Sequence, residues 1–498
     1  MSKTDSLIKQ KASKKSYDAI IIGAGPNGLA AAIVLAKAGL DVLIVEACNT
    51  VGGGCRSAEL TLPGYLHDVC SSVYPLGYGS PFFRTLPLND FGLRWINPDV
   101  SYAHPFDDNK AILVYRSIEK TATQFKEDSD AYYKLMQSLF IDWDMLCEIL
   151  LNPLHWASIQ KLIRHPLSLA NFASKSLMSA EFLSKTIFQH SLGPGVFAGV
   201  SAHSGLPLTS IASASIGLVL NIAAHAVGWP MPEGGAQKLS NSLGEYFMHL
   251  NGEIVTKCNI NSLEELPVSR LILCDLMPQQ VSRLAGHLLP TAYKKQLENY
   301  KYGPGSFKMD WALNGPIPWN NPDCLKAPTV HLGGSFEEIA QSEQAVNSKS
   351  HSSKPYVLLA QHSLFDSTRA PANKHTAWAY CHVPNGSNVD MTEAIENQIE
   401  RFAHGFKERI IARSQISPSG LASYNANYIG GDINGGSLRL GQLLMRPVPR
   451  LNPYSTPNET IYLCSAATPP GSGVHGMSGY YAALSALAGW HAKKSIAF

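Results

Sequence analysis

The stretch from Tyr17 to Glu46 constrains the fold of this chain more than any other. An apolar run from Ala19 to Ile22 predicts a strand buried on both faces of a parallel sheet. A glycine turn, Gly23 to Gly28, leads into a helix predicted over Leu29 to Ala38 and a second buried strand predicted over Asp41 to Val45. A strand, glycine turn, helix and strand within about 30 residues form the unit that binds a dinucleotide.

Each conspicuous residue of this unit has a physical task. Gly23 permits the sharp turn, Gly25 lets the backbone approach a pyrophosphate, and Gly28 lets the helix pack closely on the strand. The unpaired amides at the helix start then face the phosphates. Glu46, at the end of the second strand, can accept hydrogen bonds from ribose hydroxyls and would repel a 2′-phosphate. The pattern therefore predicts FAD or NAD rather than NADP.

Composition excludes several classes of protein. The chain has 498 residues, 45% of them hydrophobic, which is enough for a large core in two domains. Forty basic against 38 acidic residues give a formal charge of +2, so no nucleic-acid partner is expected. The nine cysteines are scattered without the spacing of a zinc site, which predicts reduced thiols, no metal and a cytoplasmic location.

Two segments raise the question of membrane contact. Residues 1–16 are basic and lack the apolar core of a secretory signal, so we expect a disordered tail. Peripheral contact of this tail with an anionic membrane is the alternative. The apolar run from Thr209 to Met231 contains serines, Asn221, His225 and Pro230, which favour a buried helix over a membrane span.

A second glycine-rich turn follows Glu46. Residues 51–57 read VGGGCRS, so Gly53 leaves the backbone open and Arg56 supplies a guanidinium that suits phosphate oxygens. Its position after Glu46 favours contact with the same dinucleotide over an ordinary surface loop. The next stretch, Gly64 to Tyr78, mixes aromatic, serine and glycine residues and is expected to be a buried loop near the ligand.

The apolar spacing then predicts a helical segment and a return to the nucleotide domain. Helical periodicity from about Asp90 to Pro230 predicts a substrate-binding or cap segment. A buried strand expected over Arg270 to Asp275 contributes again to the nucleotide domain. The remaining expectations are a helix over Gln237 to Leu250, an alternating strand within Lys301 to Trp319, a polar mobile loop from Gly333 to Ser353, and an amphipathic helix from Asp390 to Ala412.

The last part of the chain carries further glycine loops. In the turn from Tyr424 to Gly436, Asp432 either orients a ligand or satisfies turn amides. A strand over Thr460 to Ala466 leads through a loop into a helix over Tyr480 to Ala488, whose first amides would face a partial negative charge. The loop repeats the GxGxxG spacing, but no second strand or acidic ribose partner follows it, so we expect no second nucleotide there.

Jointly, these motifs resemble the FAD-dependent superfamily that includes bacterial-type phytoene desaturases, retinol saturase-like proteins and monoamine oxidases, and within it the phytoene dehydrogenase-like group. The resemblance lies in GAGPNG with Glu46, GGGCRS, HAVGWPMPEGGAQKL, GPGSFKMDWALNGPIPW, NYIGGDINGG and PPGSGVHGMSGYYAAL. It implies an α/β fold in which a Rossmann-type FAD-binding domain is interleaved with an α+β substrate domain. The implied boundaries are a tail (1–16), FAD-binding segments (17–90, 231–290 and 421–498), a helical substrate segment (91–230) and a second substrate segment (291–420).

The resemblance also implies roles for individual residues. Lys308 resembles an amine oxidase lysine linked by water to flavin N5, and Tyr480 resembles a tyrosine whose ring faces the flavin. Ile260 would meet the adenine through its backbone, and the amides of Met477 and Ser478 would face the flavin pyrimidine edge. The full set expected to hold FAD is Gly23, Gly25, Pro26, Asn27, Gly28, Glu46, Ala47, Gly53, Arg56, Ser57, Ile260, Ser465, Gly476, Met477 and Ser478.

Two departures from the family pattern matter. The region from Tyr424 to Gly436 has no cysteine to hold flavin covalently, so non-covalent FAD is expected, and the second tyrosine of the amine oxidase aromatic cage has no assured counterpart. The implied function is hydride transfer between flavin N5 and a lipophilic substrate such as a polyene, by desaturation, saturation or isomerisation. Lys308, His475 and Asp432 are the candidates for proton handling, although His475 equally fits a histidine that caps a turn.

Two alternative functions stay open. The first is a flavin amine oxidase that uses O₂, and the second is a non-catalytic interaction protein stabilised by FAD.

Overall fold

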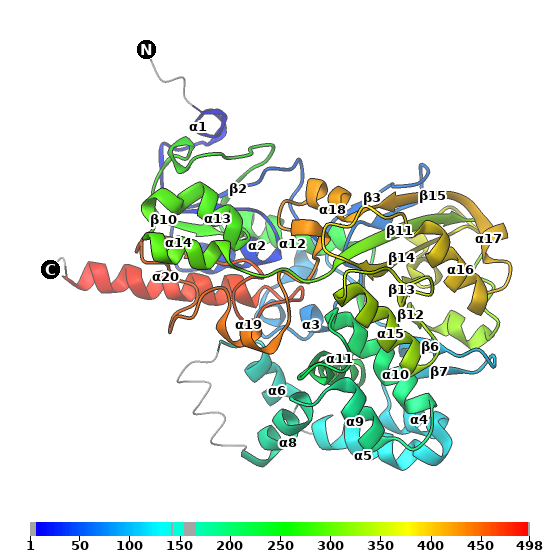
Figure 1. The fold of residues 1–498 in the computed structure, drawn as a ribbon. Coiled ribbons are helices and arrows are strands. Elements are labelled where there is room, and N and C mark those ends of the chain that lie inside the picture. The colour runs from blue at the N-terminus through cyan, green and yellow to red at the C-terminus, as the bar shows by residue number, and fades with distance from the viewer. Residues whose placement is uncertain (1–5, 141–142, 154–165, 497–498) are drawn as a thin grey trace.

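A computed structural model describes residues 6–140, 143–153 and 166–496 (Figure 1). These residues form two main sheets and a group of helices. In Figure 1 the sheet that contains the first strands lies at the left, the larger sheet lies at the right, and helices such as α5, α8 and α9 lie below.

The first sheet has five parallel strands in the order β16-β10-β1-β2-β9. Three separated parts of the chain therefore build it, as predicted. Its strands are β1 (Ser16–Ile22), β2 (Val42–Val45), β9 (Glu253–Val255), β10 (Val268–Cys274) and β16 (Ile461–Leu463).

Helices cover both faces of this sheet, which explains its continuous apolar strands. Ala19 and Ile21 belong to the core that contains α2 (Pro26–Lys37), α12 (Ala236–His249) and α20 (Met477–Ile496). Ile20 and Ile22 belong to the opposite core, beside α13 (Pro278–Ala285) and α14 (Thr291–Glu298). The sheet, with its glycine turn at the start of α2, confirms the predicted Rossmann-like unit.

The second sheet has seven strands in the order β15-β11-β14-β13-β12-β6-β7. Phe307, Met309, Trp311 and Leu313 alternate into its own apolar core, so the predicted strand with Lys308 on the opposite face is confirmed. The strands are β6 (Val100–Pro105), β7 (Ala111–Tyr115), β11 (Gly305–Leu313), β12 (Thr329–Leu332), β13 (Val357–Ala360), β14 (His375–Val383) and β15 (Ile410–Ile416). Two small sheets pair β3 (Ser57–Ala58) with β4 (His67–Asp68), and β5 (Trp95–Ile96) with β8 (Met231–Pro232).

In the sequence, most of the other α-helices lie between a strand of one sheet and a strand of the other. They are α3 (Pro75–Tyr78), α4 (Ile118–Ala122), α5 (Ser129–Phe140), α6 (Trp143–Leu150), α8 (Pro166–Ser176), α9 (Ala180–Ile187), α10 (Leu192–Ser201), α11 (Ala214–Ala226), α15 (Phe336–Asn347), α16 (Thr392–Phe402), α17 (Phe406–Arg409), α18 (Pro418–Tyr424) and α19 (Leu440–Met445). Short 3-10 helices are η1 (Phe83–Thr85), η2 (Leu88–Phe91), η3 (Thr123–Asp128), η4 (Ala202–Ser204), η5 (Leu263–Glu265), η6 (Gly286–Leu288), η7 (Pro322–Lys326), η8 (His362–Leu364), η9 (Ser367–Arg369) and η10 (Ile429–Gly431).

Three expectations about secondary structure need correction. The polar stretch from Gly333 to Ser353 is not a mobile loop but contains the helix α15. Ser335 caps this helix by accepting a hydrogen bond from the amide of Glu338. The segment expected to be helical from Asp90 to Pro230 also supplies β6 and β7, whose short length hides them among longer helical patterns. The helix expected over Asp390 to Ala412 breaks at Gly405, after which β15 joins the second sheet. Positions 141–142 and 154–165 of the helical segment lie outside the described residues.

The expected disordered tail is also partly wrong. Residues 6–16 contain the helix α1 (Leu7–Lys11), where Ile8 is buried beside the first sheet and Ser6 accepts a hydrogen bond from the amide of Lys9. Its first five positions lie outside the described residues.

The predicted buried helix within Thr209 to Met231 is confirmed as α11. Among the described residues, no helix has the length and apolar character needed to cross a membrane. The described residues also contain no group of three or more histidine, cysteine or acidic side chains placed to hold a metal ion.

Candidate functional site

The glycine turn at the start of α2 is packed too closely for side chains to replace its glycines. A Cβ atom on Gly28 would lie 2.1 Å from the carbonyl oxygen of Gly23, and one on Gly25 would lie 2.6 Å from Oδ2 of Asp275. Gly23 also has a φ of +100°, which favours glycine. The turn therefore presents backbone, rather than side chains, to the space beside it.

Glu46 lies at the end of β2 and is 6% exposed. Its Oε2 accepts a hydrogen bond from the amide of Ala24 at 2.7 Å, and its Oε1 accepts one from the amide of Cys48 at 2.9 Å. Arg56 Nη2 donates to the same Oε1 at 3.2 Å and to the carbonyl oxygen of Thr50 at 3.0 Å. Arg56 thus contacts the carboxylate and its own loop, and its contact with phosphate stays a prediction.

A cavity of about 500 Å³, which we call the glycine-turn cavity, lies against these residues. It extends from Glu46 on the first turn to Ile260 beyond β9. The predicted cofactor residues in its wall are Gly23, Gly25, Glu46, Ala47, Gly53, Arg56 and Ile260.

Asp275 is a wall residue whose role sequence reasoning missed. It follows β10, and its Oδ2 accepts a hydrogen bond from the amide of Gly28 at 3.0 Å. Burial, together with the charge of Glu46, raises the pKa of Asp275 to about 7, against the effect of the Gly28 hydrogen bond. The acidic end of this strand is visible in the sequence, but only the fold brings it to the helix start.

A second cavity of about 310 Å³, which we call the aromatic cavity, lies next to the first. Leu220, Leu358, Trp378 and Tyr380 supply apolar and aromatic wall, and His203 supplies a ring nitrogen. The residues that line both cavities are Gly25, Gly53, Asp275, Asn425 and Asn427. Cys70 to Gly77, within the stretch expected to be a buried loop near the ligand, line this cavity.

Lys308 lies behind the wall of the aromatic cavity and is 3% exposed. Its Nζ is 2.5 Å from Oδ2 of Asp310 and 5.6 Å from the ring centroid of Trp378. Trp378 lines the cavity, whereas Lys308 does not. Burial raises the pKa of Asp310 to about 6 although Lys308 opposes this shift, so the pair forms a buried ionic support beneath the aromatic wall.

The other three candidate catalytic residues also lie outside the aromatic cavity wall. Asp432 accepts hydrogen bonds from the amides of Gly303, Asn434 and Gly436, which supports its reading as a turn residue. His475 is fully buried and its Nδ1 accepts the amide hydrogen of Met477 at 3.1 Å, as a capping histidine would.

Tyr480 packs its ring against Phe82, with 4.9 Å between the ring centroids. The placement of a flavin-facing tyrosine on this residue therefore has no support from the described contacts. The role of Tyr480 beside a flavin therefore stays a prediction.

In the last segment expected to bind the cofactor, residues other than the predicted ones line the aromatic cavity. Ser57, Ser465, Gly476, Met477 and Ser478 line neither cavity, whereas Ser472, Gly473 and Val474 line the aromatic cavity. Ser478 Oγ instead donates to the carbonyl oxygen of Thr468 at 3.2 Å. The predicted Pro26 and Asn27 do lie in the aromatic cavity wall, and Gly28 acts through close packing.

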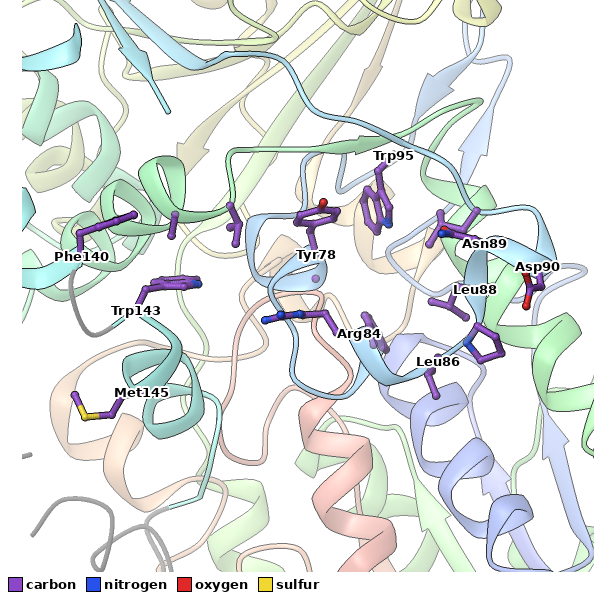
Figure 2. A pocket seen from close by; sticks show the side chains of 16 residues that line it. Tyr78, Arg84, Leu86, Leu88, Asn89, Asp90, Trp95, Phe140, Trp143 and Met145 are labelled. Carbon is purple, nitrogen blue, oxygen red and sulfur yellow. The ribbon is translucent and has the colours of Figure 1, made fainter. Parts of the chain in front are cut away.

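A third and larger cavity, of about 860 Å³, lies beside α3 (Figure 2). Figure 2 shows Tyr78, Trp95 and Trp143 along its wall, with Arg84 among them. Gly77 lines both this cavity and the aromatic cavity, so α3 separates the two spaces.

Comparison with known proteins agrees with this architecture. Residues 21–86 match the NAD(P)-binding Rossmann-like domain family. The mouse pyridine nucleotide-disulfide oxidoreductase domain-containing protein 2 is 25% identical, over 94% of this chain and 93% of that protein. An oxidoreductase of Methanosarcina mazei has a similar structure, with a TM-score of 0.62 at 14% identity over 94% of this chain and 99% of the other.

The fold of the chain is also similar to that of cyclohexylamine oxidase of Brevibacterium oxydans, with a TM-score of 0.53 at 13% identity over 96% of this chain and 99% of that protein. At these identities the structural neighbours establish the fold and leave the substrate open.

Proposed function

We propose that the chain is an FAD-dependent oxidoreductase that transfers hydride between flavin N5 and a lipophilic substrate. The observation that carries this proposal is that the glycine-turn cavity and the aromatic cavity lie side by side and share walls at Gly25, Gly53 and Asp275. A dinucleotide needs a ribose partner, an open backbone for its pyrophosphate and a separate space for its reactive ring. The two neighbouring cavities together offer these three features.

The residues present fit non-covalent FAD. A Cβ atom on Gly53 would lie 3.1 Å from Cα of Gly25, so two backbones meet where phosphates need close approach. Glu46 would hold the ribose, Ile260 would face the adenine, and Asn425 and Asn427 would serve the middle of the cofactor. Asp275 is compatible with nearby phosphate in its neutral form, which its raised pKa favours at neutral pH and below.

Bound flavin would supply the hydride acceptor or donor, and the residues of the chain would bind and orient the substrate. Leu220 and Leu358 provide apolar surface that excludes water, with Trp378 and Tyr380 beside them. The Trp378 ring is fixed because its Nε1 donates to Oγ of Ser72 at 2.7 Å and Lys308 lies over the ring. We assign Lys308 to this positioning role.

The proposal is tested by identifying the released cofactor and by reducing the purified protein with light under anaerobic conditions. Retained FAD that is reduced, and then reoxidised by a quinone with little hydrogen peroxide, is the expected result. A flavin that neither reduces nor reoxidises with any acceptor would support the non-catalytic alternative instead.

Amine oxidation with O₂ is the second candidate function. The parallel rings of Trp378 and Tyr380, with an interplanar angle of 15°, favour it because aromatic faces attract ammonium groups. A panel of primary and secondary amines scored for hydrogen peroxide separates the two proposals. Amine-dependent peroxide release at a turnover rate above that of lipophilic alkenes and ketones would select the oxidase.

A further inference from the structure

His203 lines the aromatic cavity, and its Nδ1 atom forms no hydrogen bond with any other described residue. It lies in η4 and lines the cavity, half-buried, with its ring edge-on to Trp229 at 5.6 Å. Its Nε2 is 2.9 Å from Nε2 of His331, whereas its Nδ1 has no hydrogen-bond partner among the described residues. One nitrogen is therefore anchored and the other is available to a molecule in the cavity.

His331 fixes the orientation of this ring. It lies on β12, is fully buried, and is held between the rings of Tyr102 and Trp229. Burial lowers the pKa of His331 well below its usual value and that of His203 to about 3, where the charge of His382 also contributes. Both imidazoles are thus neutral, so one of the two Nε2 atoms donates and the other accepts.

The surroundings decide which nitrogen carries the hydrogen. His331 Nδ1 is buried without a partner, and a buried donor without a partner is rarer than a buried acceptor without one. This assigns the hydrogen of His331 to Nε2, from which it is donated to His203. Neutral His203, which lines the cavity, then carries its own hydrogen on Nδ1 as an available donor.

Two other polar side chains of the wall, Ser71 and Ser72, are already paired. Ser71 Oγ donates to the carbonyl oxygen of Gly54, and Ser72 Oγ donates to Asp68 while it accepts from Trp378. Leu220 and Leu358 offer no hydrogen bonds. A wholly hydrocarbon ligand would leave the His203 donor without a partner in a dry cavity, which is unfavourable.

We propose that His203 donates its Nδ1 hydrogen to a single oxygen atom, a carbonyl or hydroxyl, of an otherwise apolar substrate. His203 is the residue that touches the substrate, and His331 is a positioning residue that holds its ring. This inference rests on the proposed function and narrows its substrate class from lipophilic molecules in general to oxygen-bearing ones.

Two isosteric probes test the proposal on the FAD-loaded protein. Octan-2-one carries the carbonyl oxygen, and 2-methyloct-1-ene replaces that oxygen with a methylene group of similar shape. Binding is followed by the flavin absorbance change and by tryptophan fluorescence. The wild type is expected to bind the ketone about tenfold more tightly than the alkene, as for one retained hydrogen bond in a dry site.

The variants separate hydrogen bonding from shape. His203→Phe should lose the ketone preference and keep its affinity for the alkene, whereas His203→Asn, which keeps a donor near Nδ1, should retain part of the preference. His331→Phe should reduce the preference less than His203→Phe does. An unchanged ketone-to-alkene ratio in His203→Phe would overturn the proposal, as would a wild type that binds both probes equally.

A spectroscopic measurement keeps the test decisive if the phenylalanine variant does not fold. The carbonyl stretch of ¹³C-labelled octan-2-one should lie at lower frequency in the wild type than in apolar solvent, and an unshifted stretch would contradict the proposal. The fluorescence titration also works on protein without flavin. Loss of FAD binding with an intact ketone preference would therefore refute the proposed cofactor and not the role of His203.

Discussion

The glycine-turn cavity and the aromatic cavity share part of one wall, yet the chain builds them in different ways. The first is formed largely by backbone at Gly23, Gly25 and Gly53, and its main side chain, Glu46, lies close to these glycines in the sequence. The second combines His203, Leu358 and Trp378 from distant segments, and side chains supply much of its wall. The dinucleotide motif is therefore local in the sequence, whereas the aromatic wall depends on distant segments that the fold brings together.

Among the variants that separate the two cavities, substitution of Gly28 should have the largest effect, on both FAD binding and stability. In Gly28→Val the new Cβ would lie 2.1 Å from the carbonyl oxygen of Gly23, so the turn must shift and FAD binding should be lost. We expect destabilisation of about 3 kcal/mol from overpacking. Flavin content and chemical denaturation measure the two effects.

Gly441→Ala is the matched control, because a Cβ there meets nothing within 4 Å. If Gly28→Val bound FAD like this control, the glycine-turn cavity would not be the cofactor site.

Removal of Lys308 should disturb the aromatic cavity and leave the glycine-turn cavity intact. Lys308→Met leaves Asp310 buried without its cation, which should cost about 3 kcal/mol in unfolding free energy. Flavin reduction or reoxidation should slow while FAD is retained. Stopped-flow absorbance and denaturant titration check these expectations.

The double variant Lys308→Met/Asp310→Asn should recover part of the lost stability, since no buried charge is left unpaired. Rates of flavin reduction and reoxidation that both stay unchanged in Lys308→Met would remove Lys308 from substrate positioning.

The pH dependence of stability should reveal the raised pKa of Asp275. Its pKa rises from 3.8 in the unfolded chain to about 7 in the folded protein, so between these values the folded state keeps a proton that the unfolded state has lost. Stability should therefore fall as pH rises from about 4 to about 7, by up to about 4 kcal/mol. Asp275→Asn should make this slope shallower and leave the part that Asp310 contributes, as measured by thermal unfolding across the range.

Asp90→Asn, at an exposed position, should leave the slope unchanged. An equal slope in the wild type and Asp275→Asn would show that Asp275 does not titrate in this range.

The smallest effect is expected at Tyr480. Its ring packs against Phe82 outside both cavities, so Tyr480→Phe should change stability by less than about 0.5 kcal/mol and leave the flavin spectrum unaltered. Tyr380→Phe, by contrast, should perturb that spectrum, because Tyr380 lines the aromatic cavity. A spectral change in Tyr480→Phe alone would reverse this assignment.

The parts of the fold that the sequence predicted are those set by local rules. The turn from Gly23 to Gly28 and the alternation of Phe307 to Leu313 depend on neighbouring residues, and both are confirmed. The helix α15 was missed because its polar surface resembles a loop until the buried positions Ile339 and Val346 are seen against the protein interior.

The residues of the candidate site also differ in whether local sequence could predict them. Glu46 and Gly25 could be placed from spacing alone, whereas His203 has no motif around it and gains its meaning from His331, which is distant in the sequence. For Asp432 and His475 the sequence left two alternatives, proton handling or a role in the turn. Their hydrogen bonds go to backbone amides of the loops, which supports the role in the turn.

The central claim is that a flavin dinucleotide occupies the glycine-turn cavity and the neighbouring aromatic cavity. Calorimetric titration of cofactor-free protein with FAD, ADP and NAD tests it most directly. The account predicts one FAD per chain, weaker competitive binding of ADP and much weaker binding of NAD. A folded protein that binds NAD as tightly as FAD, or binds no FAD, would contradict it.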